Sequence, residues 1–162
     1  MSGHKVWRLG AEIDTDQLAP GATMKLGIEG IAPHCLEAVR PEFAGSVRRG
    51  DVIAAGPGFG IGSSREQAAA ALVQLGVRAV IAPSFSGLFF RNAFNLGLLL
   101  LTCREAEQLR DGEHIALDLQ QMQVVTEGGH RLACDPIPAF LLEMVQAGGL
   151  MNQLRRKLQA PR

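Results

Sequence analysis

GPGFGIGSSREQ, residues 56–67, is a glycine-rich turn that leads from a predicted strand into a predicted helix. The strand, residues 51–55, is a short apolar run, and the helix, residues 66–75, is rich in alanine, the residue with the highest helix propensity. Glycine stands at every second position from Gly56 to Gly62, which indicates unusual backbone angles or close contacts between backbones. Such a turn brings backbone N–H groups and a helix N-terminus close to a ligand and therefore suits a bound anion.

Apolar runs on both sides of the turn predict an α/β fold in which strands and helices alternate. A continuous apolar run is typical of a parallel strand that is covered on both faces. Strands are expected at residues 5–9, 51–55, 77–82 and 98–102. Helices are expected at residues 31–38, 66–75, 85–95 (with Ser84 as its N-cap) and 104–109.

The C-terminal part of the chain has a different pattern. Residues 115–119 and 122–126 alternate apolar and polar side chains, as half-exposed antiparallel strands do, and a third short strand is expected at residues 130–134. A C-terminal helix follows at about residues 139–158, interrupted at Gly148 and Gly149. We expect residues 1–162 to form one domain.

Composition argues against several classes of protein. The formal net charge is zero, so we expect no nucleic-acid partner. The longest apolar run, residues 96–101, is too short to span a bilayer, and the N-terminus lacks the apolar segment of a secretory signal, so we expect a cytoplasmic protein with no membrane partner. The scattered cysteines Cys35, Cys103 and Cys134 form no C-x-x-C pair, which argues against a disulfide framework or a metal site within this chain.

Residues 11–30 contain a proline and several glycines without a sustained period, so they are predicted to be a long loop. Such loops are usually functional or mobile, and we expect a mobile substrate loop at about residues 14–30. Asp14 and Asp16 lie at its start. They suit acid–base chemistry or a metal ion, or else hydrogen bonds to nearby backbone groups that fix the path of the loop; the structural role is favoured.

Three interpretations of the glycine turn compete. A nucleotide-phosphate loop fits poorly, because the G-x-G-x-x-G spacing from Gly58 needs a glycine where Ser63 stands, and the turn has no lysine. A structural interpretation is a capping box, in which Ser63 and Glu66 each bond the other's backbone N–H group. It does not explain the alternating glycines, or Arg65 in the first helical turn, where a cation is unfavourable unless an anion is bound.

The third interpretation is a catalytic turn that binds a carboxylate. Arg65 offers a planar, two-pronged donor, and the helix N-terminus adds partial positive charge. Ser63 can act as a base only if the same field stabilises its alkoxide. No histidine lies near in the sequence, which argues against an ordinary serine–histidine pair.

The sequence resembles the small subunits of the isopropylmalate dehydratases over about residues 5–146. The segments that carry the resemblance are IDTDQLAP at residues 13–20, GIGSSREQAA at residues 60–69 and AVIAPSFSGLFFRNAFNLGLL at residues 79–99. These enzymes are two-subunit relatives of aconitase. The resemblance therefore implies an α/β fold of a particular kind, a swivelling three-layer β/β/α domain like the C-terminal, fourth domain of aconitase.

The resemblance also implies an activity. The family consists of hydro-lyases that interconvert 2- and 3-isopropylmalate in leucine biosynthesis by dehydration and rehydration, as a heterodimer or heterotetramer with a large subunit. It implies a [4Fe–4S] cluster on the large subunit, with an open iron that acts as Lewis acid on the substrate hydroxyl, and no cofactor on this chain. Ser63 would remove the carbon-bound proton, and Arg65, with Ser64, would bind the substrate. Gly60 and Gly62 would shape the turn.

One segment departs from the family pattern. These dehydratases usually have P-A-R-Y-L after the D-T-D-Q element, where substrate choice is partly set, whereas this chain has PGATMKL at residues 20–26. Lys25 is the cation left there. We expect Thr23 and Lys25 to line the side-chain end of the substrate, although a solvated lysine explains the residue equally well. A methyl-substituted malate or homocitrate is therefore an alternative substrate, and a non-catalytic binding or regulatory module is an alternative function.

Overall fold

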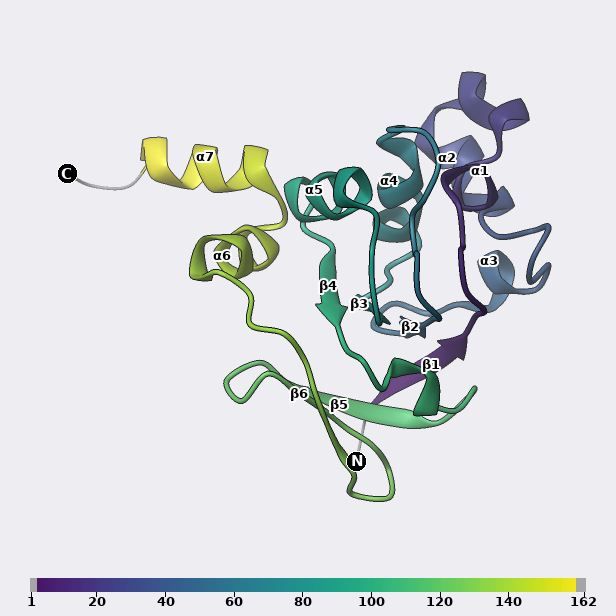
Figure 1. Ribbon diagram of the computed structural model, residues 1–162. Helices are drawn as coiled ribbons and strands as arrows, with labels where there is room; N and C mark the ends of the chain where they lie inside the picture. Colours follow the sequence, from purple (N-terminus) through teal and green to yellow (C-terminus); the bar gives the residue numbers. More distant parts are fainter. Residues whose placement is uncertain (1–2, 160–162) are drawn as a thin grey trace.

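We describe the protein from a computed structural model, in which residues 3–159 are placed; residues 1–2 and 160–162 of the expected domain lie outside the described part. The strands are β1 (His4–Arg8), β2 (Val52–Ala54), β3 (Ala79–Ala82), β4 (Leu99–Thr102), β5 (His114–Asp118), β6 (Gln123–Val125) and β7 (Arg131–Ala133). They form one seven-stranded sheet in the order β4-β3-β2-β1-β5-β6-β7 (Figure 1).

The N-terminal strands confirm the predicted parallel sheet. β1, β2, β3 and β4 are parallel neighbours, connected in part by α4 (Gln67–Gln74) and α5 (Gly87–Asn95). Every residue of β2 and β3 is buried, which is why both strands are continuous apolar runs in the sequence. The register places Ile53 beside Val80, and Val80 beside Leu100, so branched side chains fill the centre of the core.

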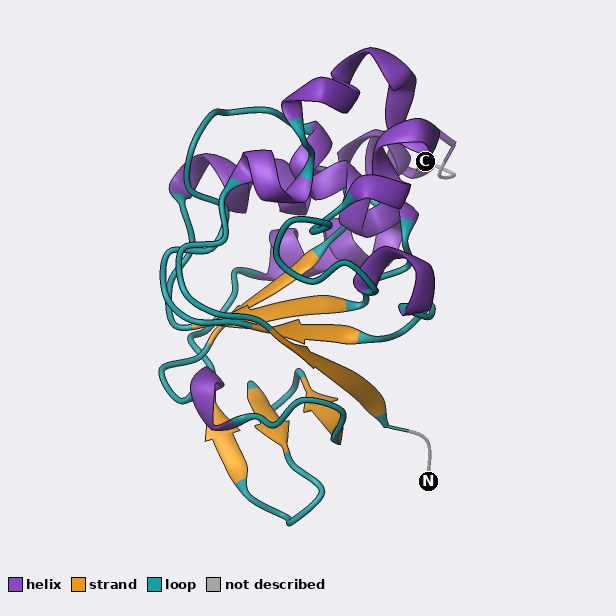
Figure 2. Cartoon of the chain, turned by 90° about the vertical axis from the view of Figure 1, so that its right-hand side faces the viewer, coloured by secondary structure: helices purple, strands orange, loops and turns teal. Residues whose placement is uncertain are grey.

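The C-terminal strands confirm the predicted antiparallel pairing. β5 pairs with β1, β6 with β5, and β7 with β6, all antiparallel. Alternation of buried and exposed side chains is visible in β7, where Leu132 is buried between two exposed neighbours. The α-helices lie above the parallel strands and β5–β7 lie below them (Figure 2). The single sheet thus curls so that its parallel strands and its antiparallel strands form two layers. With the α-helices as the third layer, the chain has the expected three-layer β/β/α arrangement.

The predicted long loop and the predicted helix at residues 31–38 are wrong in detail. Short helices occupy the region: α1 (Thr15–Leu18), η1 (Gly21–Leu26), α2 (Gly27–Ile31), η2 (Ala32–His34) and α3 (Phe43–Ser46). α1 begins with a capping box, because Asp14 Oδ1 accepts the Gln17 N–H at 2.7 Å and Gln17 Oε1 accepts the Asp14 N–H at 2.9 Å. Helices of one or two turns are too short to show a helical period in the sequence. Their formation depends on local caps, which the apolar pattern does not reveal.

The capping box considered as the structural interpretation of Ser63 and Glu66 is absent. α4 begins at Gln67 after Glu66, which makes no side-chain capping bond, while the Ser63 N–H donates to Thr15 Oγ1 at 3.1 Å. Arg65 therefore precedes the helix instead of lying in its first turn. The inference of a bound anion from a cation inside the first helical turn therefore loses its ground.

Two further helix predictions need correction. α5 begins at Gly87 after Ser86, so Ser84 is not its N-cap; Ser84 Oγ accepts the Gly58 N–H at 2.9 Å and so holds the glycine turn. The helix expected at residues 104–109 is reduced to the 3₁₀ turn η3 (Ala106–Gln108), with Leu109 buried in the core.

The C-terminal helix is interrupted as predicted. α6 (Ala139–Ala147) ends at Gly148, which has a left-handed φ of 84°, and α7 (Leu150–Gln159) follows. α7 has no buried residue and extends away from the sheet (Figure 1). Within residues 3–159, no helix has the length and apolar character needed to cross a bilayer.

Candidate active site

The glycine turn lies at the carboxyl edge of the parallel strands, between two neighbouring segments of chain. On one side the Gly60 N–H donates to the Ile13 carbonyl at 2.7 Å, and on the other the Ser86 N–H donates to the Phe59 carbonyl at 2.9 Å. These segments follow β1 and β3, which flank β2 in the sheet. Parallel strand order therefore brings the D-T-D element, the glycine turn and the start of α5 together at the edge where ligands of α/β proteins bind.

Close packing explains the glycines near the end of the turn. A Cβ atom on Gly60, whose φ is +85°, would lie 2.3 Å from Cγ of Phe89. One on Gly62, whose φ is +114°, would lie 2.8 Å from Oγ1 of Thr15. Both the left-handed backbone and the missing side chain are needed, because the turn passes directly over α5 and against the start of α1.

Ser63 lies at the exposed end of this turn with its hydroxyl held from two directions. Arg65 Nε donates to Ser63 Oγ at 3.0 Å, and the hydroxyl of Thr15 lies 3.4 Å from the same atom. Thr15 is buried, at 3% exposure, and also accepts the Ser63 N–H. Thr15 was not singled out from the sequence. The one signal that could have found it is its place between Asp14 and Asp16.

Arg65 connects the turn to the segment that follows α1. Its Nη1 donates to the Ala19 carbonyl at 2.8 Å and lies 3.2 Å from Asp16 Oδ1. Asp16 Oδ1 also accepts the Gly21 N–H at 2.8 Å. The Asp16 side chain is 69% exposed and the Arg65 side chain 26%, so water screens this ion pair and an incoming carboxylate can compete with it.

The electrostatics of the site favour a negatively charged oxygen at Ser63. A guanidinium that donates a hydrogen bond to a hydroxyl oxygen stabilises the alkoxide more than the neutral alcohol. Among the described residues no histidine bonds the Ser63 hydroxyl, so the arrangement differs from a serine–histidine pair. The chemistry that these groups can perform is removal of a proton next to a bound carboxylate.

The other predicted substrate-binding residues have different surroundings. The Ser64 carbonyl accepts a hydrogen bond from Asn92 Nδ2 at 3.1 Å, which ties the turn to α5. Thr23 is buried, and its hydroxyl donates to the Pro20 carbonyl at 2.6 Å, so it closes the first turn of η1. Lys25 is exposed near the end of η1. A role for Lys25 in substrate choice stays a prediction.

The cysteines of this chain do not fit an iron–sulfur cluster. Burial raises the pKa of Cys35 to about 12, because a thiolate would lose its contact with water there. Cys103 and Cys134 are close enough to share a hydrogen bond that lowers the pKa of Cys103. Within residues 3–159, no group of three or more His, Cys, Asp or Glu side chains is arranged to hold a metal ion.

Known proteins are similar to this chain in both fold and sequence. The family profile described as "Aconitase C-terminal domain" matches residues 45–106. A 3-isopropylmalate dehydratase small subunit from Archaeoglobus fulgidus is 40% identical over 91% of this chain and 93% of its own length. The chain belongs to the family of 3-isopropylmalate dehydratase small subunits.

Other members and a solved structure agree with this family. A homoaconitase small subunit from Thermus thermophilus is 41% identical over 97% of this chain and 98% of its own length. The crystal structure of a 3-isopropylmalate dehydratase from Methanocaldococcus jannaschii superposes with a TM-score of 0.89 at 34% identity, covering 96% of this chain and 93% of that one. Members named as small subunits imply a large-subunit partner, and the dehydratase names indicate a lyase.

Proposed function

We propose that this chain is the small subunit of a heteromeric hydro-lyase that isomerises or hydrates a hydroxy-di- or tricarboxylic acid, with Ser63 as base and Arg65 as carboxylate ligand. The observation that carries this function is the 3.0 Å hydrogen bond from Arg65 Nε to Ser63 Oγ, on an exposed turn held rigidly against α1 and α5. Family membership supports the reaction class. The free cysteines suit the cytoplasm as its compartment.

In the proposed reaction the Ser63 alkoxide takes the proton from the carbon that bears the bound carboxylate. The electrons of that C–H bond form the carbon–carbon double bond as the hydroxyl leaves the neighbouring carbon, where a Lewis acid on the large subunit would assist its departure. Arg65 Nε and the Thr15 hydroxyl stabilise the negative oxygen, and the far end of the guanidinium exchanges Asp16 for the substrate carboxylate. Within residues 3–159 no group of side chains is arranged to hold a metal ion, and the family resemblance supports a cluster elsewhere. We therefore assign the [4Fe–4S] cluster to the large subunit and the closure of the site to the pairing of the two subunits.

Two kinds of substrate are supported by relatives of nearly equal similarity. Members at 40% and 41% identity are named as 3-isopropylmalate dehydratase and homoaconitase small subunits, so identity does not separate the two. We propose 3-isopropylmalate and 2-isopropylmalate as the substrates, with homocitrate or a methyl-substituted malate as the alternatives. Lys25 favours homocitrate at the segment that departs from the family pattern, because a lysine attracts a carboxylate more than an isopropyl group.

The direct test is reconstitution with the large subunit. The two chains are purified together without oxygen, and 3-isopropylmalate, homocitrate and methyl-substituted malates are assayed in turn. We expect dehydration of at least one of these acids, and only when both chains are present. A stable, cluster-loaded complex that turns over none of them would favour a non-catalytic module.

Replacing Arg65 by lysine is expected to raise KM by about 10- to 100-fold, since a charged, two-pronged hydrogen bond is lost while the positive charge remains. The measurement is steady-state kinetics on the reconstituted enzyme. Arg104→Lys, at an exposed arginine after β4, is the matched control and should leave KM unchanged. An unchanged KM in Arg65→Lys would rule out carboxylate binding by Arg65.

Replacing Lys25 by alanine is expected to lower kcat/KM for homocitrate by about tenfold relative to 3-isopropylmalate, because one charged hydrogen bond is lost from the larger acid only. The ratio of kcat/KM values for the two substrates is the measurement, with Lys157→Ala on α7 as control. Equal ratios in Lys25→Ala and in the unmodified enzyme would show that Lys25 is a solvated surface residue.

A further inference from the structure

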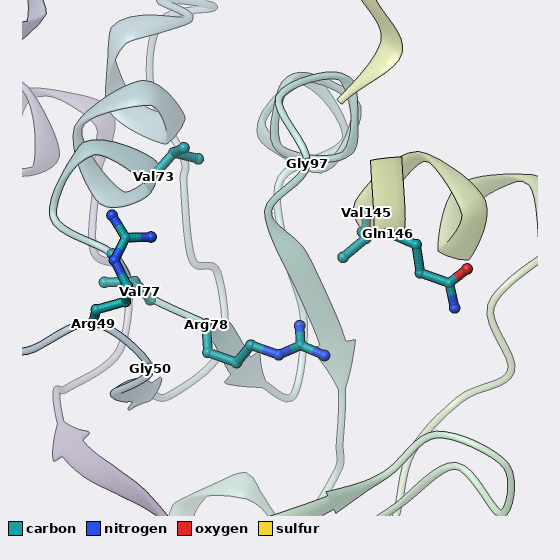
Figure 3. A pocket seen from close by; sticks show the side chains of 9 residues that line it. Arg49, Gly50, Val73, Val77, Arg78, Gly97, Val145 and Gln146 are labelled. Atoms are coloured by element: carbon teal, nitrogen blue, oxygen red, sulfur yellow. The ribbon is translucent and has the colours of Figure 1, made fainter. Parts of the chain in front are cut away.

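A second recess lies at the opposite edge of the parallel strands from Ser63 (Figure 3). Three of its lining residues come just before parallel strands: Gly50 before β2, Arg78 before β3 and Gly97 before β4. α6 closes the other side with Val145. Residues that precede parallel strands lie at the edge away from the residues that follow them, so this recess is separate from the glycine turn. Its volume is about 390 Å³, in the range of small-ligand sites.

Two guanidinium groups line the recess without a carboxylate. Arg49 and Arg78 contribute the charges, and among the described residues that line the recess none is acidic. Burial lowers the pKa of Arg78, which shows that water is partly removed from this cation with no acid in compensation. By contrast, a hydrogen bond with Asp111 raises the pKa of Arg40. Arg78 thus pays a desolvation cost that a bound anion would offset.

Helix ends offset part of this positive charge. α4 and α6 both end at the recess, through Val73 and Val145. α5 ends there as well, just before Gly97. Each helix C-terminus carries about half a negative charge, so three of them leave roughly half a unit of positive charge from the two arginines. The net charge of the lining stays positive, and it suits a ligand with one negative charge better than a ligand with two.

The rest of the wall is apolar. Val73 is 39% exposed at the end of α4, and Val77 and Val145 also line the recess, Val145 from the α6 side. Figure 3 shows the Arg78 side chain extending from the start of β3 toward α6, with Val145 on the facing side. A hydrocarbon body beside the carboxylate would cover the exposed valine surface, which a bare phosphate ion cannot do.

We propose that this recess binds a small aliphatic carboxylate, with its carboxylate group on Arg78 and its hydrocarbon body against Val73 and Val145. Arg49, on the α4 side of the recess, adds to the positive charge there. Arginine suits the role because its planar fork donates two parallel hydrogen bonds to a carboxylate. The site is independent of the proposed chemistry at Ser63, and binding to it can be measured on this chain without the large subunit.

The test is an NMR titration of the ¹⁵N-labelled chain with 3-methylbutanoate, acetate and inorganic phosphate. We expect 3-methylbutanoate to shift the amide signals of Gly50, Val77 and Gly97, and to bind about tenfold tighter than acetate because it buries three more carbon atoms. Phosphate binding as tightly as 3-methylbutanoate would overturn the ligand class. Shifts confined to the glycine turn and Arg65 would overturn the site.

Variants of the two arginines, with one control, distinguish specific binding by these side chains from the effect of removing a positive charge anywhere on the protein. Arg78→Gln is expected to weaken 3-methylbutanoate binding at least about tenfold, through the loss of a charged hydrogen bond, and Arg49→Gln should act in the same direction. Arg104→Gln removes the same charge elsewhere and should bind like the unmodified chain. Thermal unfolding of each variant checks that it is folded. Unchanged affinity in folded Arg78→Gln would disprove the site.

Discussion

Replacing Ser63 by alanine is expected to lower kcat of the reconstituted enzyme by about 10²- to 10⁴-fold, the usual contribution of a positioned base. The hydroxyl of Ser63 is the oxygen that Arg65 Nε contacts at 3.0 Å, and alanine leaves that donor facing the substrate with no proton acceptor beside it. Because Ser63 is exposed, its removal leaves no cavity in the core, and assembly with the large subunit should be retained.

Two measurements make this prediction specific. Exchange of the substrate carbon-bound proton with deuterated solvent should be lost together with turnover, because the same hydroxyl carries the proton. Ser46→Ala, at the end of α3, removes an exposed hydroxyl elsewhere and should leave kcat unchanged. Normal turnover in an assembled Ser63→Ala enzyme would exclude Ser63 as the base.

Replacing Gly60 by alanine is expected to lower the free energy of unfolding by about 2–5 kcal/mol, the sum of left-handed backbone strain and overpacking. The new Cβ would lie 2.3 Å from Cγ of Phe89, and that ring, at 2% exposure, is packed against Phe59 at 5.4 Å between ring centroids. Neither the ring nor the turn can move without disturbing the other. Urea unfolding followed by circular dichroism measures the loss.

Gly10→Ala is the matched control for Gly60→Ala. A Cβ on Gly10 would meet nothing within 4 Å, so its effect should stay within about 0.5 kcal/mol of the unmodified chain. Equal stability of the two variants would show that the turn adapts to a side chain at position 60. Since Ser63 follows three residues later, Gly60→Ala should also lower activity in whatever fraction stays folded.

Local patterns predicted the strands better than the helices. Continuous apolar runs predicted β2, β3 and β4, and alternating apolar and polar residues predicted β5 to β7. A strand that is buried on both faces needs apolar residues throughout, and a strand that is buried on one face needs them at every second position, so the residue types reveal both kinds. The region from Thr15 to Ser46 was less well predicted. Its helices have at most six residues, and caps such as that of Asp14 with Gln17 determine them.

The capping box of Ser63 and Glu66 shows how tertiary contacts override a local motif. Both residues have the right spacing, but Thr15 from another segment takes the Ser63 N–H, and the helix starts only after Glu66. The competing partner lies 48 residues away in the chain, so no local pattern could reveal it. The same contact frees the Ser63 hydroxyl for Arg65.

The residue order by itself determined the α/β layers, the antiparallel C-terminal strands and the serine and arginine of the turn, since burial period and side-chain chemistry are local properties. Tertiary structure alone decided that Thr15 supports Ser63, that Asp16 holds Arg65, and that Arg49 and Arg78 share a recess with α6. The first two contacts join segments that the order of parallel strands brings to the carboxyl edge of the sheet, and the recess joins segments at the opposite edge. That order is fixed by the packing of the whole chain.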